Sequence, residues 1–191
     1  MTDSPRERRP GGRSARVRQA VHEALRELIA EQGYRNLTIG QVAARAGVAD
    51  TSLYRRWGNL ESLIMDVVIA RIIEESPIPD TGTLQGDVRA FAGKVAHDIT
   101  GPDGLALLQA VTAAVAAGKT GEEARDRYLR ERAHQMETML DRARTRGEQV
   151  PDQGRILDGI LAPLYIRVLF GMSPFDDGYL DDLVERALAK R

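Results

Sequence analysis

Six polar residues stand close together in the first third of the sequence: Asp50, Thr51, Ser52, Tyr54, Arg55 and Arg56. The first three have short side chains that can reach base edges or phosphate oxygens. The last three carry hydrogen-bond donors that suit phosphates. The pattern indicates binding to a nucleic acid, because these groups form no arrangement known to cleave or transfer a bond.

Catalytic and metal-binding motifs do not occur elsewhere in the sequence. Cysteine is absent, which excludes thiol nucleophiles, disulfides and cysteine-based metal centres. The histidines His22, His97 and His134 are far apart and have no metal-ligand spacing. Gly118-Lys119-Thr120 resembles the end of a phosphate-binding loop, but Ala113 occupies the place of that loop's first glycine. We therefore expect no enzyme activity, no metal and no cofactor.

The polar stretch is predicted to lie on the second helix of a helix-turn-helix. The first helix is expected over 38–46, where Thr38 and Gln41 have the spacing of a capping box. Gly47 supplies the positive φ that a tight turn often needs, and the second helix follows over 50–57. The start of this second helix would enter the major groove of DNA.

The rest of the chain after residue 14 is also predicted to be helical. Val17, Val21, Leu25 and Ile29 recur at four-residue steps and mark one apolar helix face before Gly33. A further helix is expected from about residue 60 to 72. Glycines and prolines then separate five more predicted helices, over 84–100, 103–117, 122–146, 153–171 and 176–190. Pro163 is expected to kink its helix or to mark a local start. The fold class is all-α, with about nine helices.

Charge divides the chain into a basic part and an acidic part. The whole protein has a net charge of −1, but residues 1–60 contain 11 arginines, no lysine and six acidic residues, a net charge of +5. The remaining 61–191 have a net charge of −6. We predict a disordered basic arm over 1–14, a helix-turn-helix domain over 15–60 and a second helical domain over 61–191.

The arginines of the N-terminal segment fit two interpretations. They are Arg6, Arg8, Arg9, Arg13, Arg16 and Arg18. One interpretation is an arm that enters the minor groove of DNA. The other is a solvated tail that adds only diffuse attraction to phosphates.

The sequence from Leu37 to Val48 (LTIGQVAARAGV), together with SLYRRW at 52–57 and Glu61-Ser62-Leu63, closely resembles the TetR family of bacterial transcriptional repressors. The resemblance covers about residues 15–65. The stretch 159–170 also looks like the C-terminal domain of one actinobacterial-type subgroup. Two positions depart from the family pattern, since Ala49 replaces a frequent serine and Leu60 a frequent lysine. Any phosphate contact carried over to these two positions is therefore in doubt.

The resemblance implies an Ω-shaped homodimer whose three N-terminal helices bind double-stranded operator DNA. An effector in the second domain would move helix four and change the spacing of the two DNA-binding domains. Dimerisation is expected through the last two helices, 153–171 and 176–190. Family DNA-contact positions fall on Thr38, Thr51, Ser52, Tyr54 and Arg55. Arg45, Asp50 and Arg56 complete the predicted DNA-binding set.

Candidate walls of the effector pocket are apolar and aromatic residues of the second domain: Met65, Ile69, Phe91, Val95, Leu108, Met136, Met139 and Tyr165. Methionines and aromatics suit an adaptable pocket, but for each residue taken singly ordinary core packing is the better explanation.

The expected function is a DNA-binding regulator, a repressor released from a pseudo-palindromic operator by a small-molecule effector. The alternative is a helical small-molecule-binding or scaffold protein whose helix-turn-helix is only structural. No apolar run approaches the roughly 20 residues that a membrane span needs. No signal peptide is recognisable at the N-terminus. We therefore expect a cytoplasmic protein without a membrane partner.

Overall fold

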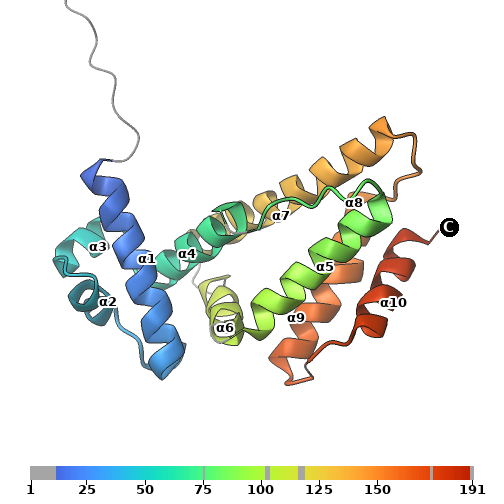
Figure 1. Cartoon of the computed structure of the whole chain (residues 1–191). Coiled ribbons are helices and arrows are strands. Elements are labelled where there is room, and N and C mark those ends of the chain that lie inside the picture. The colour runs from blue at the N-terminus through green and yellow to red at the C-terminus, as the bar shows by residue number, and fades with distance from the viewer. Residues whose placement is uncertain (1–11, 75, 102–103, 116–118, 173, 190–191) are drawn as a thin grey trace, which may run out of the picture. The chain divides into compact units, whose positions relative to one another are not determined.

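A computed structural model of the chain describes residues 12–74, 76–101, 104–115, 119–172 and 174–189 (Figure 1). These residues form helices and loops and contain no β-strand, so the predicted all-α fold is confirmed. The chain divides into two compact units, Met1–Asn59 and Leu60–Arg191. Each unit has its own buried apolar side chains.

The first unit is a small three-helix domain. Its elements are α1 (Arg13–Gln32), a 3₁₀ turn (Tyr34–Asn36), α2 (Ile39–Arg45) and α3 (Asp50–Trp57). α2 packs against both α1 and α3, and Leu25, Val42 and Leu53 are completely buried among them. α1 begins at Arg13, within the predicted disordered arm over 1–14, and residues 1–11 of that arm lie outside the described residues.

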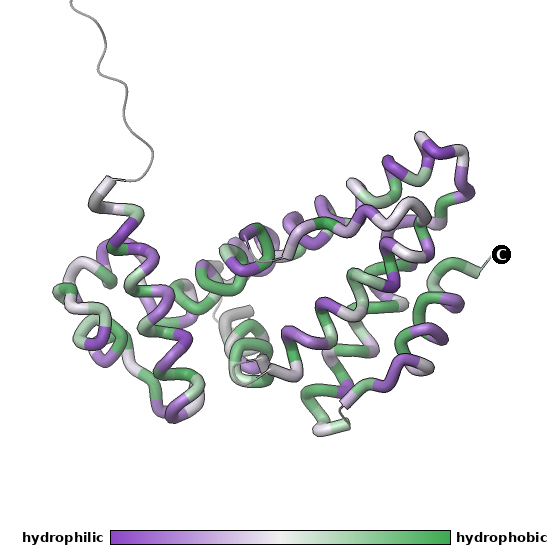
Figure 2. The backbone as a smooth tube through the Cα atoms, in the orientation of Figure 1, coloured by the Kyte–Doolittle hydropathy of each residue, from purple (hydrophilic) through white to green (hydrophobic). Residues whose placement is uncertain are grey.

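The second unit is a larger helical bundle. Its elements are α4 (Leu60–Glu74), α5 (Leu84–Thr100), α6 (Gly104–Val115), α7 (Lys119–Thr145), α8 (Gln153–Ile156), a π-helical turn (Leu157–Leu161), α9 (Ala162–Leu169) and α10 (Asp177–Leu188). Figure 2 shows hydrophobic and hydrophilic residues alternating along α5 and α10, as expected for amphipathic helices. The main core joins α5, the C-terminal half of α7, α8, α9 and α10. The helices expected after residue 60 are all present, with ends shifted by a few residues.

Pro163 divides the predicted helix 153–171 into parts. Proline has no N–H for an α-helical bond, and its ring crowds the preceding turn. The chain adopts one π-helical turn before it, in which the Ala162 N–H donates to the Leu157 carbonyl five residues earlier. The α-helical pattern resumes with Pro163 in the first turn of α9. The alternative that Pro163 marks a local start is therefore the one observed.

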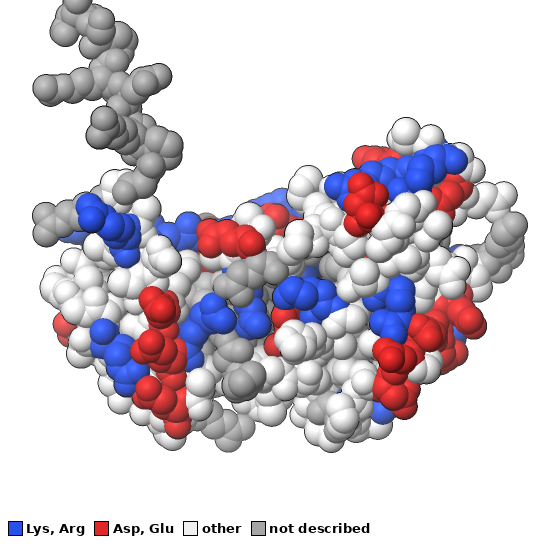
Figure 3. Space-filling view, viewed as in Figure 1, with Lys and Arg blue, Asp and Glu red and all other residues white. Residues whose placement is uncertain are grey.

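Gly159 in this π-helical turn allows α10 to approach closely. A methyl group on Gly159 would lie 3.0 Å from Cβ of Ala187, which is tighter than most carbon contacts in proteins. Figure 3 shows acidic side chains gathered over α10. On this helix, Asp177 and Asp181 form ion pairs with Arg89 of α5 and so link α10 to α5.

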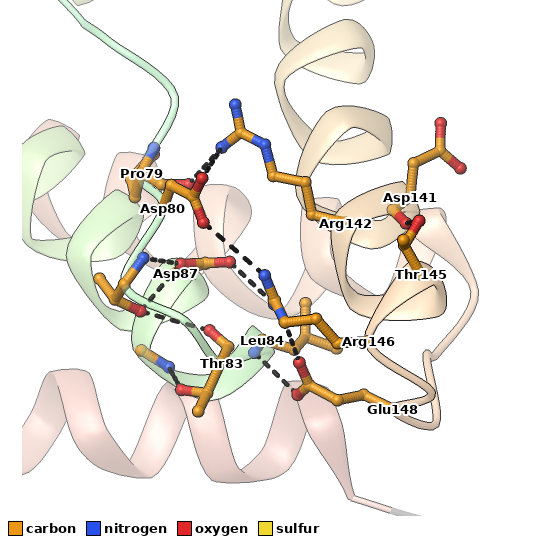
Figure 4. Close-up of polar contacts among 12 residues, drawn as sticks. Pro79, Asp80, Thr83, Leu84, Asp87, Asp141, Arg142, Thr145, Arg146 and Glu148 are labelled. Carbon is orange, nitrogen blue, oxygen red and sulfur yellow. Dashed lines mark hydrogen bonds and ion pairs between the residues drawn. The ribbon is translucent and has the colours of Figure 1, made fainter.

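A polar network holds the loop before α5 against the end of α7 (Figure 4). The Asp87 carboxylate is completely buried and accepts bonds from the N–H of Thr81 at 2.5 Å and from its hydroxyl at 2.8 Å. Arg146 donates to the same carboxylate at 3.2 Å, while Glu148 accepts from the Leu84 N–H at 2.9 Å. The Leu84 N–H and the Arg146 guanidinium hold the pKa of Glu148 below its ordinary value. The network therefore fixes the start of α5 relative to α7.

We predict that Asp87→Ala destabilises the protein by about 1–3 kcal/mol, because the partly buried hydrogen bonds from Thr81 and from the Arg146 guanidinium lose their acceptor. Urea unfolding followed by circular dichroism measures this change. Asp141→Ala is the matched control, because its partner Arg144 lies on the surface and such pairs contribute at most about 1 kcal/mol. Equal urea midpoints of unfolding for Asp87→Ala and Asp141→Ala would contradict a stabilising role for the Asp87 network.

Candidate nucleic-acid interface and ligand cavity

The helix-turn-helix contains both local features expected from the sequence, a capping box at the start of α2 and a glycine in the turn. The Gln41 N–H donates to the Thr38 hydroxyl at 3.3 Å, and the Thr38 N–H donates to the Gln41 side chain at 2.8 Å. The predicted capping box is therefore confirmed. Gly47 has φ +66°, a value that disfavours any side chain at this position of the turn.

α3 presents a polar face because its only completely buried side chain is Leu53. On the opposite side Asp50, Thr51 and Arg55 are exposed and Ser52 is partly exposed. Tyr54 is 54% exposed although it is aromatic, so its ring is available to a partner. Burial of one leucine thus directs a cluster of hydrogen-bonding groups outward, which is the arrangement that a recognition helix requires.

Ala49 precedes α3 and provides no side-chain cap for its first turn. The Ser52 N–H still bonds to the Ala49 carbonyl at 2.9 Å, which closes the turn. The usual cost of a missing N-cap is about 1 kcal/mol, so this helix depends more strongly on the burial of Leu53.

Arg45 lies in an ion-pair cluster with α1. Its guanidinium donates to Glu31 at 2.7 and 2.9 Å and to Glu27 at 3.0 Å. These bonds lower the pKa of Glu31, and they raise the pKa of Arg45. The structure thus places this predicted DNA-binding residue among carboxylates of its own domain, where it joins α2 to α1.

Arg56 also contacts its own domain. Its guanidinium lies 5.0 Å from the ring centroid of Trp57 and donates to the Ser14 hydroxyl at 3.1 Å. The Trp57 ring in turn lies 6.5 Å from the ring of His22 on α1. Of the three arginines predicted to bind DNA, Arg55 is the one without a partner among the described residues. This division was not predicted, because the hydrogen-bond partners of Arg45 and Arg56 on α1 are far away in the chain.

The second unit contains a cavity with about 480 Å³ of empty space, part of it open to solvent. Five helices and Ser76, two residues after the end of α4, contribute to its walls. The apolar lining residues are Val68, Ile72, Ile99, Gly104, Leu107, Leu108 and Val111. The polar lining residues are Arg71, Ser76, Asp98, Tyr128, Arg132 and Tyr165. This combination of an apolar wall with a few polar groups is typical of small-molecule sites.

The polar side of the cavity is organised by hydrogen bonds. The hydroxyls of Tyr128 and Tyr165 lie 2.5 Å apart. Arg132 donates to the Tyr128 hydroxyl at 3.5 Å and to the Gln135 side chain at 3.0 Å. Gln135 donates to the carbonyl oxygens of Ile72 and Ser76, at the end of α4. The buried guanidinium is thereby linked to the backbone of α4.

Two of the predicted pocket residues, Leu108 and Tyr165, line this cavity. The other six lie in the hydrophobic core: Met65, Ile69, Phe91, Val95, Met136 and Met139. The Phe91 ring lies 5.8 Å from the Arg132 guanidinium, behind the cavity wall. Sequence reasoning missed most polar lining residues, although Tyr128 and Arg132 share one face of a helix through their four-residue spacing.

None of the helices described in the structure is long and apolar enough to span a membrane. Within the same residues, no group of three or more His, Asp or Glu side chains is arranged to hold a metal ion.

Comparisons with known proteins identify several relatives. The chain is 29% identical over 171 residues to the uncharacterized HTH-type transcriptional regulator YdeS of Bacillus subtilis, covering 88% of this chain and 86% of YdeS. It is 35% identical over 136 residues to the HTH-type transcriptional regulator AqdR of Rhodococcus erythropolis, covering 71% of this chain and 65% of AqdR. The crystal structure of the TetR family transcription regulator SCO0332 superposes with a TM-score of 0.73 at 29% identity, covering 88% and 94% of the two chains.

Two family models match the two units. One describes bacterial regulatory proteins of the tetR family and matches residues 22–67; the other describes a tetracyclin repressor-like C-terminal domain and matches residues 78–187. The fold and these matches define a helix-turn-helix transcriptional regulator that binds DNA and is not an enzyme. The chain belongs to the TetR family, which confirms the resemblance seen in the sequence. The alternative of a scaffold protein with a purely structural helix-turn-helix is set aside, because these relatives are regulators.

We predict that Arg45→Ala lowers the unfolding temperature at neutral pH and that the difference from the native chain shrinks in acid. Pairing with Arg45 lowers the pKa of Glu31 in the folded protein. The ion pair therefore contributes its full stability at pH values above the pKa of glutamate in the unfolded chain. This stability is lost as the pH falls through the pKa of Glu31 in the folded protein. Thermal unfolding by circular dichroism at several pH values measures both effects. Arg16→Ala is the control, because this exposed arginine on α1 makes none of these pairs. If Arg45→Ala lowers the unfolding temperature by the same amount at every pH, the ion-pair explanation is ruled out.

Proposed function

We propose that this regulator is a repressor that binds a pseudo-palindromic operator as a homodimer and is released by a small-molecule effector. Repression and effector release are typical of the TetR family. The observation that carries the DNA-binding part is the outward polar face of α3, held in place by buried Leu53. Since operator DNA lies in the cytoplasm of a bacterial cell, the proposal includes a cytoplasmic protein.

The exposed residues divide by chemistry into base-reading and phosphate-binding groups. Thr51 and Ser52 stand in the first turn of α3 and can reach base edges in the major groove. Tyr54 and Arg55 follow, with a hydroxyl and a guanidinium suited to phosphates. Thr38 has its hydroxyl at the start of α2, and Asp50 stands in the first turn of α3. Both can contribute to the same interface.

Arg45 and Arg56 are proposed to act indirectly. Their guanidinium groups donate hydrogen bonds to side chains of α1, so they position α2 and α3, the helices that carry the contacts. Their removal is expected to affect the stability of the domain as well as its affinity for DNA.

The homodimer is proposed to form through α9 and α10. Large apolar side chains are exposed at the end of α9 and just after it, namely Ile166 (54%), Phe170 (75%) and Met172 (50%). Exposed apolar side chains grouped in this way are characteristic of protein interfaces. The two-fold axis of such a dimer would match the symmetry of a pseudo-palindromic operator.

The effector is proposed to bind the cavity of the second unit. Val68, Arg71 and Ile72 of α4 line this cavity. α4 also follows α3 directly in the chain, since α3 ends at Trp57 and α4 begins at Leu60. A ligand that favours one position of α4 can therefore shift the population of DNA-binding conformations.

We predict that Arg55→Ala weakens DNA binding across all sequences and lowers the slope of log affinity against log salt by about 1. Tyr54→Phe should weaken binding without changing sequence preference, because a lost phosphate contact carries no base information. Fluorescence anisotropy with fragments flanking the protein's own gene measures both. Arg130→Ala, an exposed arginine on α7, is the control. A loss confined to one base position would contradict the phosphate assignment.

We predict that Phe170→Glu converts the dimer to a monomer, because it places a charge in an apolar contact. Sedimentation velocity measures the assembly state. Leu129→Glu is the matched control, since Leu129 is exposed on α7, outside the proposed interface. If Phe170→Glu still dimerises with the same dissociation constant, the dimer interface does not include Phe170 and lies elsewhere on the chain.

A further inference from the structure

The most unusual group in the second unit is Arg132, which lines the cavity although it is only 6% exposed. A buried guanidinium is normally paired with a carboxylate, because an uncompensated charge in the protein interior is costly. Among the residues that the structure describes, no carboxylate pairs with Arg132. Its partners are the Tyr128 hydroxyl, the Gln135 amide and the faces of two aromatic rings.

The neighbouring hydroxyls do not supply the missing negative charge. Burial raises the pKa of Tyr165 well above its ordinary value, and the adjacent Tyr128 adds to the shift. The Tyr165 phenol therefore remains neutral at neutral pH. Asp98 is the acidic residue in the lining, but it is paired with Lys94 at 2.6 Å and with Arg71 at 3.5 Å.

The unused donors of Arg132 and the other walls of the cavity indicate the chemistry of a ligand that fits it. A guanidinium has five N–H donors, and the described residues accept from two of its nitrogens. Leu107, Leu108 and Val111 of α6, with Ile72 and Ile99, form an apolar wall.

From this arrangement we infer that the cavity binds a small molecule with an apolar body and a single carboxylate, and that Arg132 is the residue that binds the carboxylate. Carboxylate oxygens match the fork of guanidinium donors and supply the absent counter-charge. The Tyr128 and Tyr165 hydroxyls stand beside this position, and because one of them donates to the other, one O–H remains as a further donor. The inference rests on the proposed function only in assigning the ligand of this cavity the role of effector.

The position of Arg132 also connects the ligand to α4. Gln135 accepts from Arg132 and donates to the carbonyl oxygens of Ile72 and Ser76. A carboxylate that draws the guanidinium toward the cavity competes with Gln135 for the same donors. Binding therefore alters the hydrogen bonds at the end of α4.

The test is isothermal titration calorimetry on the full chain without DNA. The probes are octanoate, 4-phenylbutanoate and 1-naphthylacetate, each compared with its neutral amide. At least one acid should bind, about tenfold or more tightly than its own amide, since hydrogen bonds between charged groups are the stronger ones. The inference is overturned if no acid binds or if the amides bind as tightly as the acids.

Two variants test the assignment to Arg132. Arg132→Met should abolish the preference for acid over amide while the unfolding temperature is kept or raised, because a buried unpaired charge is removed. Tyr165→Phe should weaken acid binding severalfold and provides a second readout if Arg132→Met does not fold. Arg130→Met, exposed on the same helix, should bind like the native chain. Unchanged acid binding in a folded Arg132→Met, or in Tyr165→Phe where that variant alone folds, would refute the assignment.

The same samples separate this inference from the proposed function. If the chain binds operator DNA but no acid, the inferred class of ligand is wrong, while the proposal that the chain is an operator-binding regulator stands. If an acid binds but does not release the protein from its operator, the carboxylate site stands and the effector role fails.

Discussion

The structure depends first on the burial of a few apolar side chains that hold short helices in place. α2 and α3 have seven and eight residues, which is too short for a helix to be stable by itself in water. They persist because Leu53, Val42 and Ala43 are buried against α1 and against each other. Once Leu53 is buried, the helical period directs Thr51, Tyr54 and Arg55 outward. DNA recognition is thus a consequence of packing on the opposite face of one helix.

The second unit solves a different problem, because it keeps several charged and polar side chains away from bulk water. Each of these groups needs a partner, and most have one in the protein. Asp87 is satisfied by Thr81 and Arg146, and Asp98 by Lys94 and Arg71. Arg132 lacks a carboxylate among the described residues, so its charge remains available to a ligand. The contrast between a completely satisfied network and an incompletely satisfied one distinguishes a structural cluster from a binding site.

Local signals in the sequence were sufficient for the helices and for the helix-turn-helix. The capping box at Thr38 and Gln41 and the turn at Gly47 depend on neighbours within a few residues, so they could be recognised from spacing. The partners of Arg45 lie 14 and 18 residues away on α1, and Tyr128 meets Tyr165 across 37 residues. Such contacts depend on tertiary packing. An apolar pattern also does not distinguish a core position such as Met136 from a cavity wall such as Leu107.

We propose that two copies of this chain read the two halves of one symmetric DNA site through α3. The most direct measurement compares the affinity of the intact protein for a pseudo-palindrome from its own promoter with that for the same DNA with one half-site scrambled. The account predicts that the symmetric site binds at least about a thousandfold more tightly than nonspecific DNA and that scrambling one half removes most of this advantage. Equal affinity for the symmetric, half-scrambled and nonspecific DNA would contradict it.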